Sequence, residues 1–272
     1  MPAFDHHFMP LHPTVEGDDY KALESKGLIT FATQAGYELT VRFLCLREQV
    51  RIIAVTVPRA AASHKDLHKW MKQIMETAIS ALRLSVEPEA NPVYTASGFI
   101  SLMYQSDDPE PKYQVRFGTT VNPDYRLSIE HVVGVFGAIS TKALAPIAAL
   151  FAEAQMPSLP IHYRVLSLVR AIELLYEDER QRAAVLDAFE PHFAKLNISD
   201  QPFRSALPQI RTRCAHGRSR GRTNPRPFVG IGYNETELRP LFDLLRSVVA
   251  HALSNVHKLT LAGVEHQPAP AS

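Results

Sequence analysis

The chain has 272 residues, which is enough for two modest domains or one large one. Hydrophobic residues make up 46% and charged residues 21%, a globular composition that excludes a largely disordered protein. The formal net charge is only +1, so a role in nucleic-acid binding must depend on where the charges lie rather than on their sum.

Cys45 and Cys214 lie in different predicted elements. Two cysteines are too few for a disulfide scaffold or a cysteine-based zinc site, and they fit a reducing compartment. Residues 1–13 lack a basic segment followed by an apolar core, so we expect no signal peptide. The apolar stretch 132–154 contains Lys142, which costs roughly 2.5–3.5 kcal/mol at the centre of a membrane span. We therefore expect a buried helix there, no membrane contact and a cytoplasmic protein.

The first half of the chain predicts strands and one helix. A polar connection that ends at Gly36 indicates a hairpin turn. We predict one long helix from Ser63, as its N-cap, to about Leu84, because its apolar residues recur at spacings of three and four. We expect an antiparallel sheet with this helix packed on it. The predicted strands, rich in β-branched and aromatic residues, are 27–33, 37–46, 50–57, 94–104 and 112–121.

After residue 125 the hydrophobic period becomes helical. The sequence therefore predicts an α+β protein with a β-rich N-terminal domain (1–125), an all-α helical bundle (126–260) and a disordered tail (261–272). The predicted helices lie near 128–155, 160–177, 178–196, 202–216 and 235–258.

An arginine-rich segment occupies residues 201–234. It has no acidic residue, and its seven arginines give a local charge of +7. The planar guanidinium binds phosphate oxygens in pairs and does not lose its proton, so this segment is suited to a phosphate backbone. A solvated basic loop is the alternative interpretation. The arginines are Arg204, Arg211, Arg213, Arg218, Arg220, Arg222 and Arg226.

The helix that begins this segment carries a histidine at its end. Leu207, Ile210 and Cys214 recur at spacings of three and four, so we expect this face to enter the core. Arg211 and His216 are five residues apart, about 140° around an ideal helix, and share a face only if the helix loosens at its end. Arg213 and His216 are three residues apart and share a face directly. A histidine can exchange protons near neutral pH, and an arginine can stabilise charge on a phosphate. The pair suits metal-independent RNA cleavage; the alternative is a histidine that interacts with the helix dipole.

An arginine, four intervening residues and a histidine late in a helical bundle resemble the RX4-6H motif of the HEPN superfamily. Residues 162–175 (HYRVLSLVRAIELL) are similar to the glutamate-bearing helix of ApeA-like HEPN domains, and residues 211–217 (RTRCAHG) resemble their R-x-x-x-x-H-G element. A β-rich half before such a bundle also resembles methylamine-utilisation accessory proteins. The resemblance covers about residues 126–258.

The resemblance implies a homodimer in which two motifs form one composite ribonuclease site. Arg211 would bind or stabilise the scissile phosphate, His216 would act as general base or acid, and Glu173 would orient the arginine. From the residues alone, a solvated surface carboxylate beside Arg170 is favoured over an active-site role for Glu173. Many active members carry Asn, Asp or His after the arginine, where this chain has Thr212.

Other candidate sites have simpler interpretations. His6, His7 and His12 are expected to be surface residues of a mobile arm. His64 and His68 are four apart on the predicted helix, but no glutamate base separates them. The Gly230–Gly232 stretch is too short for a dinucleotide loop, and Cys214 is expected to be packed rather than reactive. No cofactor or metal is expected.

The sequence thus predicts a metal-independent endoribonuclease, or an RNA-binding relative, that uses Arg211 and His216. Glu173, Thr212 and Arg213 would support the pair, and a small molecule or protein would act as a trigger on the N-terminal domain. The alternative is a non-enzymatic accessory or scaffold protein, and the resemblance suggests methylamine utilisation as one such role. A nucleotide-binding sensor without cleavage is the third hypothesis. The arginines expected to bind RNA phosphates are Arg218, Arg220, Arg222 and Arg226.

Overall fold

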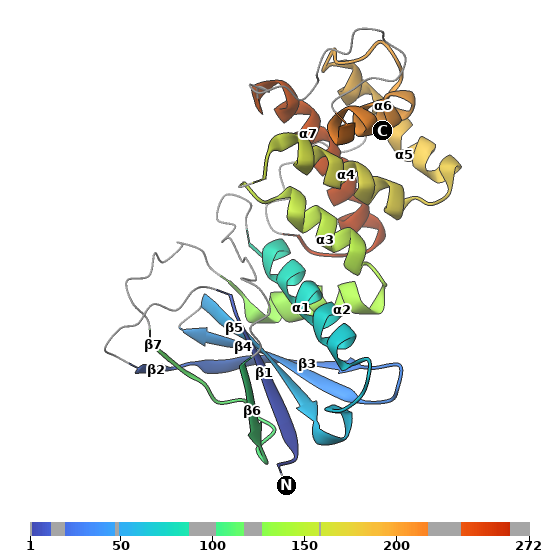
Figure 1. Ribbon diagram of the computed structural model, residues 1–272. Helices are drawn as coiled ribbons and strands as arrows, with labels where there is room; N and C mark the ends of the chain where they lie inside the picture. The colour runs from blue at the N-terminus through green and yellow to red at the C-terminus, as the bar shows by residue number, and fades with distance from the viewer. Residues whose placement is uncertain are drawn as a thin grey trace. The chain divides into compact units, whose positions relative to one another are not determined.

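The computed structural model describes residues 2–11, 20–46, 49–86, 102–116, 127–157, 159–216 and 235–261. The chain divides into two compact units, Met1–Thr141 and Lys142–Ser272. The first unit combines an antiparallel sheet with helices, and the described part of the second is helical (Figure 1). The predicted α+β class is therefore confirmed.

A five-stranded antiparallel sheet forms the body of the first unit, in the order β3-β4-β5-β1-β6. The predicted hairpin turn joins β3 to β4, and its Gly36 has a φ of 81°, which glycine adopts without steric cost. The strands of the large sheet are β1 (Phe4–Pro10), β3 (Glu24–Ala32), β4 (Glu38–Leu46), β5 (Gln49–Pro58) and β6 (Leu102–Ser106). A second, two-stranded sheet pairs β2 (Tyr20–Ala22) with β7 (Gln114–Arg116).

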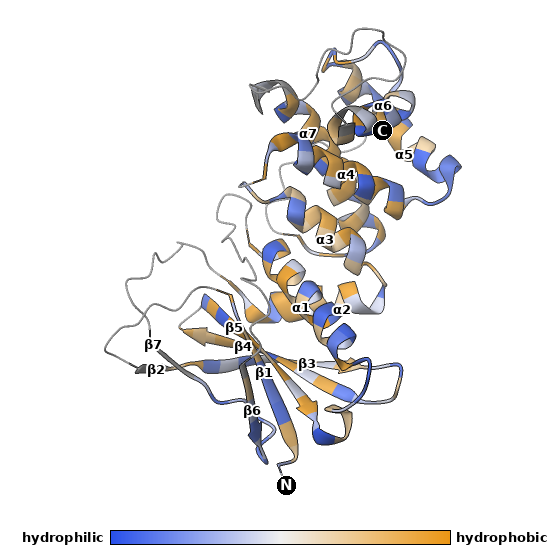
Figure 2. Ribbon diagram, in the orientation of Figure 1, coloured by the Kyte–Doolittle hydropathy of each residue, from blue (hydrophilic) through white to orange (hydrophobic). Residues whose placement is uncertain are grey.

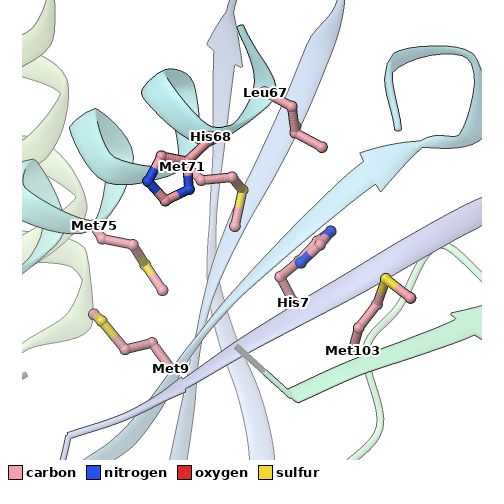
Figure 3. A pocket seen from close by; sticks show the side chains of 7 residues that line it. All are labelled: His7, Met9, Leu67, His68, Met71, Met75 and Met103. Atoms are coloured by element: carbon pink, nitrogen blue, oxygen red, sulfur yellow. The ribbon is translucent and has the colours of Figure 1, made fainter. Parts of the chain in front are cut away.

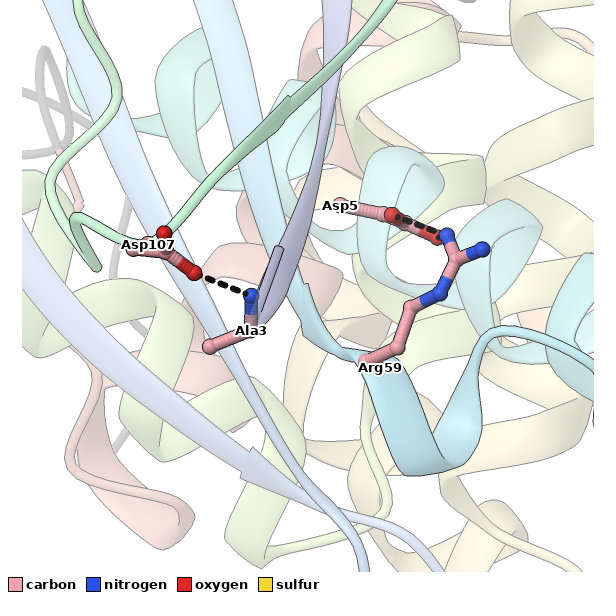
Figure 4. A network of polar contacts seen from close by, with 4 residues as sticks. All are labelled: Ala3, Asp5, Arg59 and Asp107. Atoms are coloured by element: carbon pink, nitrogen blue, oxygen red, sulfur yellow. Dashed lines mark hydrogen bonds and ion pairs between the residues drawn. The ribbon is translucent and has the colours of Figure 1, made fainter. Parts of the chain in front are cut away.

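Strand β1 lies inside the large sheet, between β5 and β6. The prediction of a mobile arm with surface histidines was wrong here, and His6 is fully buried. Polar groups at this end of the chain form ion pairs and hydrogen bonds with residues that are distant in the sequence. Asp5 pairs with Arg59 at 2.8 Å, and the backbone nitrogen of Ala3 donates to Asp107 Oδ1 at 3.0 Å (Figure 4).

Helix α1 (Leu67–Leu84) belongs to the first unit and buries the side chains of Ile74 and Ala78. The predicted start at Ser63 was wrong. Residues 59–61 form a 3-10 turn, and the chain turns again before the helix begins. The end of the helix agrees with the prediction.

The division between the units lies further along the chain than residue 125. Helix α2 (Ile129–Thr141) packs against α1 and β3, so it belongs to the sheet unit. The single helix predicted over 128–155 is two helices, α2 and α3 (Ala145–Ala154). Pro146 cannot donate the backbone hydrogen bond that a continuous helix needs, and Ala143 turns the chain with a φ of 53°.

The second unit packs its helices around α4, which contacts α3, α6 and α7 and is largely hydrophobic (Figure 2). Within the described ranges, no helix combines the length and the apolar character that crossing a membrane requires. Residues 262–272, almost all of the predicted tail, lie outside the described ranges. The remaining helices are α4 (Ile161–Leu175), α5 (Glu179–Ala194), α6 (Phe203–His216) and α7 (Glu235–His251), followed by a π-helical turn (Ala252–Val256).

Candidate functional site

Helix α6 presents one apolar face to the core of the second unit. Leu207, Ile210 and Cys214 are 3%, 8% and 3% exposed, which confirms the face expected from their spacing. Burial raises the pKa of the Cys214 thiol to about 12. The thiol therefore stays protonated at neutral pH, and Cys214 is packed rather than reactive, as predicted.

Helix α4 carries Glu173 at the edge of its buried face. Ile172, the residue before it, is fully buried, whereas Glu173 is partly exposed. Ser167 on the same helix is buried, and its hydroxyl donates to Glu153 Oε2 at 3.1 Å. Glu173 thus lies where the core of the unit meets solvent.

Glu173 and Arg211 form an ion pair between α4 and α6. Oε1 of Glu173 lies 3.2 Å from Nη1 of Arg211, and the two side chains are 30% and 50% exposed. The residues alone favoured a solvated Glu173 beside Arg170, whereas the structure places its carboxylate against Arg211. An exposed pair of this kind contributes about 0–1 kcal/mol to stability. Its main physical effect is to restrict the guanidinium, which keeps further N–H donors for a ligand.

Two other motif residues have different surroundings. The Thr212 hydroxyl donates to the backbone carbonyl of Pro208 at 2.9 Å, so it is held by its own helix. The backbone of Arg213 and His216 belongs to α6, with His216 as the last helical residue, and their side chains lie outside what the structure describes. Their approach to Arg211 stays a prediction.

The four arginines predicted to bind RNA phosphates lie in residues 217–234, outside the described residues. Their role also stays a prediction. They are Arg218, Arg220, Arg222 and Arg226.

A groove of about 480 Å³ lies beside the ion pair, and sequence reasoning missed it. Glu173 lines it together with Arg182 from α5 and Arg204 from α6. Arg204 also pairs with Asp187 at 3.2 Å. A signal was present in the sequence: Arg204 and Arg211 are seven residues apart, which places both on one helix face. The groove thus places the guanidinium groups of Arg182 and Arg204 beside the carboxylates of Glu173 and Glu179.

The histidines of the first unit do not form the arrangements considered from the sequence. His64 precedes α1 and stacks on Trp70 with a ring separation of 4.5 Å, so His64 and His68 do not share a helix. His6 and His7 belong to β1, whereas His12 lies outside the described residues. Among the residues that the structure describes, no three His, Cys, Asp or Glu side chains gather as metal ligands would.

The chain was compared with known protein families, with curated proteins and with solved structures, and no match was found in any of the three comparisons.

Proposed function

We propose that the second unit binds RNA across α4 and α6 and cleaves it without a metal, as a HEPN-type endoribonuclease. The observation that carries the proposal is the ion pair between Glu173 and Arg211. A carboxylate on a neighbouring helix limits the freedom of a long side chain, and a pre-positioned guanidinium binds a phosphate at a lower entropic cost. The RX4-6H spacing of Arg211 and His216 supports the same assignment.

The proposed reaction is an attack by the ribose 2′-hydroxyl on the adjacent phosphodiester. A base removes the hydroxyl proton, the 2′-oxygen forms a bond to phosphorus, and the bond to the 5′-oxygen breaks. An acid returns a proton to that leaving oxygen. The products are a 2′,3′-cyclic phosphate and a 5′-hydroxyl. Arg211 would stabilise the negative charge that develops on the phosphate, and His216 would transfer a proton near neutral pH.

This reaction favours a homodimer. A base is needed on one side of the phosphate and an acid on the other, while each RX4-6H motif contains one histidine. Two facing motifs would supply both groups. We place the protein in the cytoplasm, because Cys45 and Cys214 are both free and buried. In this proposal the sheet unit receives the trigger, a small molecule or a protein.

The test is an RNA cleavage and binding assay with the purified full-length chain in EDTA. We expect cleavage to survive chelation, to leave 2′,3′-cyclic phosphate ends, and to be lost in Arg211→Ala and His216→Ala. Arg180→Ala is the matched control, because Arg180 is an exposed arginine on a different helix, α5. RNA binding that weakens only in Arg211→Ala, without cleavage, would support the RNA-binding relative. A wild-type chain that neither binds nor cleaves RNA would overturn the proposal in favour of an accessory or scaffold protein.

A further inference from the structure

A pocket of about 370 Å³ lies between helix α1 and the large sheet of the first unit (Figure 3). We call it the Met/His pocket. Helix α1 contributes His68, Met71 and Met75, together with Leu67, and β1 and β6 contribute the remaining residues. The described lining residues are His7, Met9, Leu67, His68, Met71, Met75 and Met103.

Regular backbone geometry directs these side chains to one place. On α1, His68, Met71 and Met75 follow each other at spacings of three and four, so they lie on one helix face. On β1, His7 and Met9 are two residues apart and share one face of the sheet. In the pairing of β1 with β6, His7 stands directly opposite Met103, which brings their Cβ atoms to about 4.5–5.5 Å.

The composition of the pocket is unusual for this chain. The protein has six methionines, and four of them line this pocket with two imidazoles and no carboxylate among the described lining residues. Methionines that fill irregular gaps in a core have no reason to reach solvent. Met9, Met71 and Met75 fit that role at 3–7% exposure, whereas Met103 is 57% exposed on β6, the edge strand. Core packing therefore does not account for the whole set.

The chemistry shared by these side chains is soft metal ligation. Thioether sulfur prefers monovalent copper over hard cations, and neutral imidazole is a ligand for copper as well. Met103 and His68 are exposed, whereas Met9, Met71 and Met75 are buried. The pocket therefore has donor atoms both near solvent and in its buried part.

We propose that the Met/His pocket binds a soft monovalent cation of the Cu(I) class, with its ligands drawn from the thioethers of Met71, Met75 and Met103 and the imidazoles of His7 and His68. The inference rests on the first unit alone and does not depend on the proposed ribonuclease.

The first test uses Ag⁺ in chloride-free buffer as a redox-stable probe, with the full-length chain labelled at the methionine methyl carbons. We expect Ag⁺ to shift the methyl resonances of Met71, Met75 and Met103. Met156 lies outside the pocket and is the internal control. This readout separates the pocket from Cys45 and Cys214, because silver bound to those thiols leaves the pocket methyls in place. Mg²⁺ should shift none of them.

The second test compares two leucine variants, which keep side-chain volume and remove sulfur. Met71→Leu/Met103→Leu should weaken Ag⁺ affinity at the pocket at least tenfold, read at the methyl resonance of Met75, and Met156→Leu should not change it. Met103→Leu alone removes one sulfur without disturbing the fold, because Met103 is exposed. Pocket methyls that do not move with Ag⁺, or an affinity that the double variant retains, would overturn the proposal. A pocket that responds to Zn²⁺ but not to Ag⁺ would overturn it too, since histidines alone would then be the ligands.

Discussion

Glu173 on α4 and Arg211 on α6 are 38 residues apart in the chain and 3.2 Å apart in the structure. The pair joins two packed helices at the surface, next to the groove that Arg182 and Arg204 line. An ion pair so exposed adds little to the free energy of unfolding. It does fix the position of a guanidinium that would otherwise sample many rotamers. The effect of the ion pair on the free energy of unfolding and its effect on the position of Arg211 can therefore be measured separately.

Glu173→Gln removes the charge and keeps the size of the side chain. We expect the free energy of unfolding to change by less than about 1 kcal/mol. We expect kcat for RNA cleavage to fall roughly 10- to 100-fold with a smaller change in KM, because Arg211 loses its fixed position. The measurement is steady-state cleavage kinetics, with Glu177→Gln, an exposed carboxylate just beyond α4, as the control. If Glu173→Gln and Glu177→Gln behave alike, Glu173 is no positioning residue.

Arg164 is the arginine on α4 that the structure buries. Its Nε donates to the backbone carbonyl of Ala154 at 2.7 Å, and its guanidinium carbon lies 4.3 Å from the centre of the Phe242 ring. We expect Arg164→Ala to lower the free energy of unfolding of the second unit by about 2–4 kcal/mol, because it leaves a cavity and an unpaired carbonyl. Urea unfolding followed by far-UV circular dichroism measures this. Arg170→Ala, at an exposed position of the same helix, should change stability by less than about 0.5 kcal/mol.

The helical unit could be predicted well because its signals are local. The spacing of Leu207, Ile210 and Cys214 identified the buried face of α6. The same periodicity did not distinguish the roles of two arginines on α4: Arg164 is buried and Arg170 is exposed. That distinction depends on Phe242 and Ala154, which only the packing of α3, α4 and α7 brings near.

The first strand could not be predicted for a related reason. The sequence from Phe4 to Pro10 places Asp5 and two histidines side by side, a pattern that indicates exposure when it is considered alone. Residues at least 50 positions away make burial possible. Arg59 neutralises Asp5, while Thr56 and the backbone of Asp108 bind His6. Strand pairing over such separations leaves no local periodicity to detect.

His6 makes stability depend on pH. Its ring is fully buried, with Nδ1 2.9 Å from Thr56 Oγ1 and Nε2 2.9 Å from the carbonyl oxygen of Asp108. Burial lowers its pKa below the ordinary 6.5, so the unfolded chain takes up a proton more readily than the folded one. The contribution of His6 to the free energy of unfolding is therefore fully present above pH 6.5. It is lost as the pH falls from 6.5 through the lowered pKa of the folded state. Urea unfolding followed by the fluorescence of Trp70, the single tryptophan, measures this in the first unit.

The comparison variant is His6→Asn, which cannot titrate. We expect its unfolding midpoint to vary less with pH between 7 and 5 than that of the wild type. His7 has a pKa lowered by burial as well, so a weaker dependence remains in the variant. Ring-carbon NMR of His6 in the wild type gives a measurement that needs no variant. A His6 resonance that titrates at 6.5 or above would contradict the prediction.

Gly27 on β3 is the place where α2 approaches the sheet. A Cβ at this position would lie 2.9 Å from Cγ2 of Ile129 and 2.9 Å from Cγ2 of Val133, and the φ of 65° already disfavours a side chain. Both neighbours are β-branched and stiff, so they cannot turn away without a shift of the helix. We expect Gly27→Ala to lower the free energy of unfolding of the first unit by about 2–4 kcal/mol, measured by urea unfolding with Trp70 fluorescence.

Gly36→Ala is the matched control, because its φ of 81° carries the same backbone cost while its Cβ would meet no atom within 4 Å. It should cost only about 1–2 kcal/mol. Equal losses of unfolding free energy in the two variants would mean that Ile129 and Val133 of α2 do not pack closely against Gly27. That result would contradict the contact between α2 and β3 described for the sheet unit.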